Sequence, residues 1–84
     1  MMAEHESYNE EELNEARRYP VVVQWSDADQ LYLASAPDLE NLVVHGVTPE
    51  EAIAKIPEAV ANWIYGMRSV GQSIPAPSPA LAIH

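Results

Sequence analysis

The chain has 84 residues, of which 13 are acidic and 4 are basic, and its formal net charge is −9. This length is enough for one compact domain and too short for two. It contains no cysteine, which excludes disulfide bonds and cysteine-ligated zinc and favours a reducing cytoplasm over a secreted location. The acidity argues against direct nucleic-acid binding, which needs a Lys and Arg surface, and suits a basic protein partner. The simpler interpretation, that acidity only keeps the chain soluble, stays open.

The two ends of the chain differ in composition from its middle. Residues 1–18 contain six glutamates, and in their second half only Leu13 and Ala16 are apolar, so we predict an acidic arm that is mobile or forms a short helix. Residues 19–75 form the domain proper, and residues 76–84 are expected to be a proline-rich extended tail. No apolar run reaches the roughly 20 residues of a membrane helix, and the acidic start is unlike a signal peptide. We therefore expect no membrane association.

Three short segments of the domain have the composition of β-strands. Residues 19–25 are rich in β-branched and aromatic side chains, and residues 31–36 and 42–46 are also largely apolar. The Ser and Asp side chains of residues 26–30 are typical of a tight turn, because they bond to their own backbone. The first two strands should therefore form a hairpin, and Pro37 should end the second strand.

The start of a helix is the clearest signal in the sequence. Thr48 can cap the helix, Pro49 fits its first position, and Glu51 stands where it completes a capping box. Apolar residues then recur at helical spacing as far as Val70. Pro57 lies inside this pattern and lacks the N–H that the helix requires, so we expect a kink or break there, at a local cost of about 3 kcal/mol.

Apolar residues occur on both faces of the expected sheet, but the sequence offers one strongly amphipathic helix, which can cover one face. The other face must meet the N-terminal arm, a second copy of the chain or a different protein. We favour self-association as a homodimer or larger assembly. The expected contact residues are Val22, Tyr32 and Ala34, on the face opposite Trp25.

The sequence has no pattern typical of a catalytic, cofactor-binding or metal-binding site. His5, His45 and His84 are far apart in the chain, and three glycines are too few for a phosphate-binding loop. No serine has the surroundings of a nucleophile elbow. We therefore expect no catalytic residues, no cofactor and no metal ligands.

Four carboxylates in the loops are candidates for chemistry or for partner binding. Asp27 and Asp29 lie in the expected hairpin turn, and Asp38 and Glu40 follow the second strand. Converging carboxylates can hold Mg²⁺ for phosphodiester cleavage, but turn formation accounts for the same aspartates. We favour the second explanation and assign the four side chains to the rim of a protein-binding surface.

The segment from Tyr19 to Pro77 resembles the HicB antitoxin family. The resemblance rests, in chain order, on Tyr19-Pro20-Val21-Val22, Asp27 and Asp29, Tyr32 to Leu39, His45-Gly46, Thr48 to Ala52, Trp63, Gly71 and Ile74-Pro75. It implies an α+β fold of the partial RNase H-like type. In this fold an antiparallel three-stranded meander is followed by one long helix and by a short fourth edge strand, here near Ser73-Ile74.

The resemblance also implies a function, that of a non-catalytic antitoxin-like module that inhibits a small basic HicA-like ribonuclease toxin by occlusion in the bacterial cytoplasm. The chain departs from the family in four ways. Glu40-Asn41-Leu42 stands where the family often has a Pro-Gly-Cys-like turn, Gln30 replaces a glycine common in the first hairpin, and Pro57 is unexpected. We also expect the C-terminal DNA-binding segment of the family to be missing. The alternative function is a solitary homo-oligomeric domain with a structural or other binding role and no toxin partner. A degenerate nuclease using the acidic loops is a third hypothesis, which we do not favour.

Overall fold

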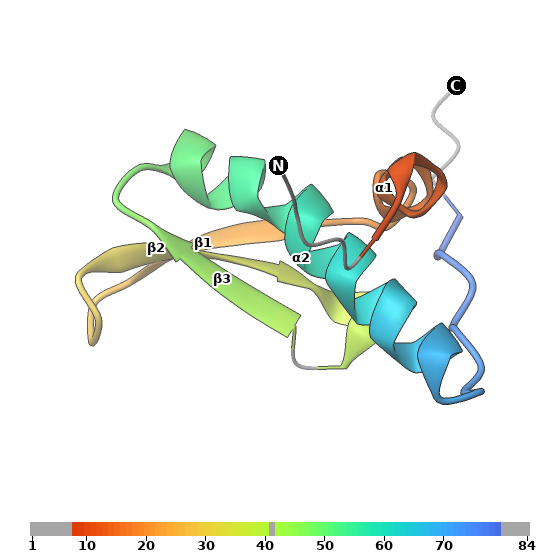
Figure 1. The fold of residues 1–84 in the computed structure, drawn as a ribbon. Coiled ribbons are helices and arrows are strands. Elements are labelled where there is room, and N and C mark those ends of the chain that lie inside the picture. Colours follow the sequence, from red (N-terminus) through yellow and green to blue (C-terminus); the bar gives the residue numbers. More distant parts are fainter. Residues whose placement is uncertain (1–7, 41, 80–84) are drawn as a thin grey trace, which may run out of the picture.

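The computed structural model describes residues 8–40 and 42–79, and its helices lie on one face of a three-stranded sheet (Figure 1). In chain order the elements are α1 (Glu10–Ala16), β1 (Val22–Ser26), β2 (Leu31–Ala36), the 3-10 turn η1 (Pro37–Leu39), β3 (Leu42–Gly46) and α2 (Pro49–Ser69). The strands form an antiparallel meander in the order β1-β2-β3. The expected α+β class, the meander and the long helix after it are confirmed.

At its centre, the face of the sheet under α2 is built from small and β-branched residues. Ala34 and Ala36 of the central strand are fully buried, and Val23 and Val44 lie beside Ala34 in register on the two outer strands. The buried side of α2 consists of Ala52, Ile56, Val60, Ala61 and Ile64. Because alanines on both elements allow the helix to approach the sheet closely, the core is thin and tightly packed.

Thr48 caps the start of α2 as the sequence predicts, but the predicted capping box is only half formed, because Glu51 bonds to the amide before Thr48. The Thr48 hydroxyl accepts a hydrogen bond from the Glu51 amide at 3.0 Å, and the Glu51 carboxylate accepts one from the Val47 amide at 2.6 Å. These two contacts satisfy amides that have no partner within the helix. At the other end Gly71, with a φ of +76°, adopts the left-handed conformation typical of a helix C-cap.

α2 continues through Pro57 without interruption, so the break expected there is not found. Proline removes the hydrogen bond that residue 57 would donate to the carbonyl of Ile53. Ile53 lies on an exposed side of the helix, where water can satisfy that carbonyl. Ile56 and Val60, on either side of the proline, are buried against the core and hold both halves of the helix in line.

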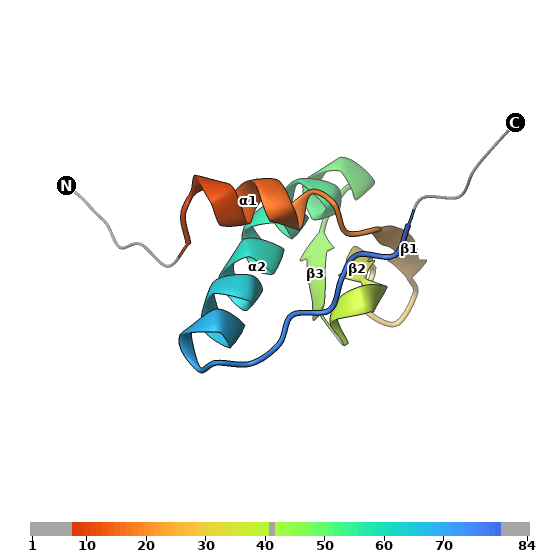
Figure 2. The ribbon, with the colours of Figure 1, turned by 90° about the vertical axis from the view of Figure 1, so that its right-hand side faces the viewer.

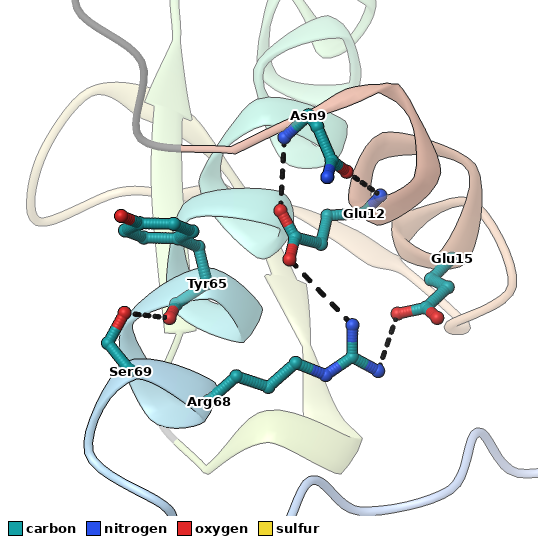
Figure 3. A network of polar contacts seen from close by, with 6 residues as sticks. All are labelled: Asn9, Glu12, Glu15, Tyr65, Arg68 and Ser69. Atoms are coloured by element: carbon teal, nitrogen blue, oxygen red, sulfur yellow. Dashed lines mark hydrogen bonds and ion pairs between the residues drawn. The ribbon is translucent and has the colours of Figure 1, made fainter.

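α1 is a short helix, one of the two forms expected for the acidic arm, and it is docked against α2. Asn9 and Glu12 form a capping box, in which each side chain accepts a hydrogen bond of 3.0 Å from the backbone amide of the other residue. Ala16 is buried in the core, and Arg68 of α2 lies 2.9 Å from Glu15 and 3.8 Å from Glu12 (Figure 3). α1 lacks a continuous apolar stripe, and it is attached by Ala16, by the partly buried Leu13 that packs against the core, and by Arg68. Residues 1–7 of the expected arm lie outside the described residues.

The expected fourth strand is not formed within the described part of the chain, where residues 72–79 have no strand structure. This segment runs from the end of α2 back past η1 (Figure 2). It is fastened at two points. The Tyr19 hydroxyl donates to the Pro75 carbonyl, and the amide and hydroxyl of Ser78 donate to the Asp38 carboxylate at 2.7 and 2.8 Å. Side-chain bonds therefore replace a strand ladder.

Candidate functional site

The four carboxylates assigned to partner binding separate into two pairs at opposite ends of β2. Asp27 and Asp29 lie in the turn between β1 and β2, whereas Asp38 and Glu40 lie in and after η1, beyond the other end of the strand. The six residues of β2 span about 20 Å. The four side chains therefore do not converge on one ion, and the described residues include no group of three or more His, Asp or Glu side chains that could hold a metal.

The β1–β2 turn is held by its own side chains. Asp27 accepts a hydrogen bond from the Trp25 ring nitrogen at 2.7 Å, and Asp29 accepts one from the Ser26 hydroxyl at 3.1 Å. The Gln30 side chain donates to the Asp27 carbonyl at 2.8 Å. Gln30 has a φ of +55°, a left-handed conformation that glycine adopts without strain. This backbone conformation explains why a glycine is expected at position 30. The hydrogen bond to Asp27 holds the glutamine that stands there instead.

An aromatic pair adjoins this turn. Trp25 and Tyr32 are directly opposite each other in register, and their rings meet edge to face with centroids 5.0 Å apart. Trp25 is 47% exposed although it is large and apolar. We call Trp25, Asp27, Asp29 and Tyr32 the hairpin surface. Its partly exposed, oriented tryptophan beside two carboxylates has the composition typical of an interaction hot spot.

Sequence reasoning assigned the two aspartates of the hairpin surface to a binding rim but missed its aromatic centre. Trp25 was interpreted only as a marker of one strand face. The available signal was its place immediately before the Ser26-Asp27 turn, where a ring N–H needs an acceptor and finds one two residues later.

Asp38 and Glu40 have a different setting. Both carboxylate oxygens of Asp38 accept hydrogen bonds from Ser78, so Asp38 fastens the tail to η1. Glu40 is exposed and has a φ of +57° in the turn that follows η1. These two residues therefore do not extend the hairpin surface.

The three expected oligomer contacts, Val22, Tyr32 and Ala34, do not lie on one face. Ala34 is fully buried under α2, and Tyr32 lies on the same side of the sheet, against Trp25. Val22 lies on the opposite side and is 43% exposed. The hairpin pairing sets this arrangement, because Trp25 stands opposite Tyr32 and directly paired residues share a face. Tyr32 and Ala34 are thus wrong as contacts on a face opposite Trp25.

Tyr19 lies where the tail crosses the start of the sheet. Burial raises the pKa of its hydroxyl above the usual value of 10.0, and the carboxylates of Glu15 and Asp38 raise it further, while Arg68 acts in the opposite direction. The hydroxyl is protonated at neutral pH and donates to the Pro75 carbonyl. This environment gives Tyr19 a structural role, as an anchor for the tail.

Comparison with known proteins places this sequence in a family. Neither helix within residues 8–40 and 42–79 has the length and hydropathy that crossing a membrane requires. No curated protein and no solved structure matches the chain. The sequence model of the HicB-like antitoxins of bacterial toxin–antitoxin systems matches residues 19–83, which include the whole sheet and α2 and leave α1 outside. The chain therefore belongs to the HicB-like antitoxin family.

Proposed function

We propose that this antitoxin inhibits a small basic HicA-like ribonuclease toxin in the bacterial cytoplasm by covering it, without catalysing a reaction itself. The observation that supports this most is the hairpin surface, where the half-exposed Trp25 is fixed by Asp27 and packs on Tyr32. Membership in an antitoxin family supports a toxin as the partner.

Charge supports a basic partner of this kind. The chain has a net charge of −9, so it repels RNA but attracts a protein whose own surface is built to bind RNA. Two of its few cations already have carboxylate neighbours within the protein, since Arg68 lies beside Glu15 and Lys55 lies 3.9 Å from Glu51. The outward-facing carboxylates therefore dominate the field that an approaching partner meets.

In the hairpin surface, aromatic side chains are expected to supply the affinity and carboxylates the association rate. Trp25 and Tyr32 provide rigid aromatic area that loses water on binding, and such residues supply most of the affinity of an interface. Asp27 and Asp29 are exposed at the rim, where charges speed association and add little to the lifetime of the complex. The association rate should therefore fall steeply with salt, and the dissociation rate should change little.

The test uses purified protein and a small basic HicA-like ribonuclease, with binding kinetics measured at several salt concentrations. Trp25→Ala should weaken binding at least about 30-fold, mainly through faster dissociation. Asp29→Asn should slow association and reduce its salt dependence. The matched control is Tyr65→Ala, which removes an aromatic ring of similar exposure from α2 and should change neither rate. Equal effects of Trp25→Ala and Tyr65→Ala would contradict the proposed site.

A solitary homo-oligomeric domain is the second candidate function, and it is favoured by the sheet face opposite α2, which no helix in the described residues covers (Figures 1 and 2). Under that alternative the chain self-associates, but no small basic ribonuclease binds it. Under our proposal, co-expression with the toxin restores growth and suppresses RNA cleavage. The two candidates are therefore separated by one growth assay.

A further inference from the structure

The aromatic pair of the hairpin surface belongs to a row of residues that crosses the whole sheet. Trp25 of β1 is paired with Tyr32 of β2, and Tyr32 is paired with Gly46 of β3. The first turn of α2 sits on the glycine end of this row, since a Cβ on Gly46 would meet the Ala52 backbone. α2 therefore covers the β3 end of the row, while Trp25 at the β1 end is 47% exposed.

Two contacts fix the orientation of the Trp25 ring. Its N–H donates to Asp27 Oδ1 at 2.7 Å, and its contact with Tyr32 is edge to face, with 67° between the ring planes. Tyr32 is itself partly buried and packs against the core. An indole N–H points along the ring plane, and an edge-to-face contact uses at most one face of the indole. At least one face of the Trp25 ring is therefore left free by both contacts.

The carboxylates beside this ring are not paired with a cation of their own chain. The ion pairs within the described residues use Glu12, Glu15 and Glu51, and none of them involves Asp27 or Asp29. The face of an aromatic ring has a negative potential, and a carboxylate at its edge adds a full negative charge, so both attract a cation. The hairpin surface is thus complementary to a positively charged side chain supplied by another molecule.

The shape of the site favours arginine over lysine. A guanidinium group is planar and weakly hydrated, so it can stack on an indole face and at the same time donate to a carboxylate at the edge of the ring. Asp27 lies at this edge because it accepts the indole N–H. The ammonium group of lysine is compact and strongly hydrated, and it gains less from a flat apolar face.

We infer that the hairpin surface is a binding site for one arginine side chain of a basic protein partner, with the guanidinium stacked on Trp25 and directed toward Asp27. The inference rests on the proposed function for the identity of the partner, and it adds which chemical group of that partner the site recognises. Asp27 is a positioning residue that sets the orientation of the ring. The stacked ring supplies the selectivity for arginine, and the exposed charges mainly speed encounter.

Two peptides of equal charge, hexa-arginine and hexa-lysine, test this selectivity without any ribonuclease. NMR titrations of the isotope-labelled full chain follow the indole N–H signals of its two tryptophans, Trp25 and Trp63. Hexa-arginine should bind about two- to fivefold more tightly than hexa-lysine. It should shift the Trp25 signal and leave in place the signal of Trp63, which packs against the core. Because the peptides have the same charge, their general attraction to the acidic chain cancels in the comparison.

Four variants assign the preference for arginine to particular residues. Trp25→Leu should abolish it, so that both peptides bind with equal affinity. Asp27→Asn keeps an acceptor for the indole N–H and should retain more of the preference than Asp27→Ala, which frees the ring. The matched control is Tyr65→Leu, which removes an aromatic ring of similar exposure from α2 and should leave the preference unchanged. The backbone amide spectrum checks that each variant is folded.

Equal affinity of the two peptides for the wild-type chain would overturn the inference. A preference for arginine that survives Trp25→Leu would overturn it as well, and so would hexa-arginine shifts confined to signals remote from Trp25 and Tyr32. None of these measurements involves the ribonuclease. A failure of this inference and a failure of the proposed function are therefore distinguished by separate experiments.

Discussion

At the scale of single residues, Gly46 marks the closest approach of the sheet to α2. A Cβ added there would lie 2.4 Å from the Ala52 amide nitrogen and 2.9 Å from the Thr48 carbonyl oxygen. Both contacts are with backbone, which cannot rotate away. Gly46 therefore allows the first turn of α2 to seat directly on the end of β3.

We expect Gly46→Ala to lower the free energy of unfolding by about 1–3 kcal/mol, as overpacked cores do, when measured by urea denaturation. The matched control is Gly66→Ala within α2. No atom lies within 4 Å of a Cβ at this position, so the change should raise stability by about 0.5–1 kcal/mol through helix propensity. An unaltered stability of Gly46→Ala would contradict the close contact.

Tyr19 should make the stability of the protein sensitive to alkaline pH. Its folded-state pKa is raised above 10.0, first by burial and then by Glu15 and Asp38, so the contribution of the neutral hydroxyl is complete below pH 10 and is lost as the pH rises through the folded-state value. Tyr19→Phe should be less stable than wild type at pH 8, because the bond to Pro75 is gone, and the difference should shrink above pH 10. Urea denaturation at both pH values measures this, and a constant difference would contradict it.

At the scale of elements, Pro57 lies in a helix that packing keeps continuous. Proline inside a helix costs about 3 kcal/mol relative to alanine, and α2 retains its hydrogen-bonded turns on both sides. Pro57→Ala should therefore raise the free energy of unfolding by about 1–3 kcal/mol, as measured by thermal and urea denaturation. Pro49→Ala is the matched control, because proline fits the first helical turn and its loss should bring no gain. A Pro57→Ala variant less stable than wild type would mean that the ring itself packs in the core.

The elements that sequence predicted well are those with local signals. The second and third strands have the expected bounds, and α2 begins at the expected cap, because side-chain alternation and capping act within a few residues. The expected first strand covers residues 19–25, but β1 begins at Val22. Tyr19 lies before the strand, where its hydroxyl donates to the Pro75 carbonyl. The docking of α1 depends on Arg68, which is more than 50 residues away in the chain. No local pattern contains that contact.

The candidate site was only half predictable for a related reason. Alternation shows which residues of one strand share a face, but not which faces of two strands coincide. That phase depends on the length of the turn, here four residues between Ser26 and Leu31, and a shift of one residue exchanges the faces. With a turn of this length, Tyr32 pairs with Trp25 and Ala34 is buried under α2. Tyr32 is therefore part of an aromatic pair, although the sequence analysis expected it to be an oligomer contact.

At the scale of the whole molecule, the two faces of the sheet differ. The face under α2 also bears the aromatic rings of the hairpin surface, with the Asp27 carboxylate bonded to Trp25. No helix in the described residues covers the opposite face (Figures 1 and 2).

The central claim is that this protein blocks a ribonuclease by covering it, and a titration of RNA cleavage tests it most directly. A fixed amount of a small basic HicA-like ribonuclease is incubated with RNA and increasing amounts of the antitoxin. We predict that cleavage falls in proportion to added antitoxin and stops near one chain per ribonuclease, whereas Trp25→Ala requires a large excess. Full cleavage at a tenfold excess of wild-type protein, or cleavage of RNA by the antitoxin alone, would contradict the claim.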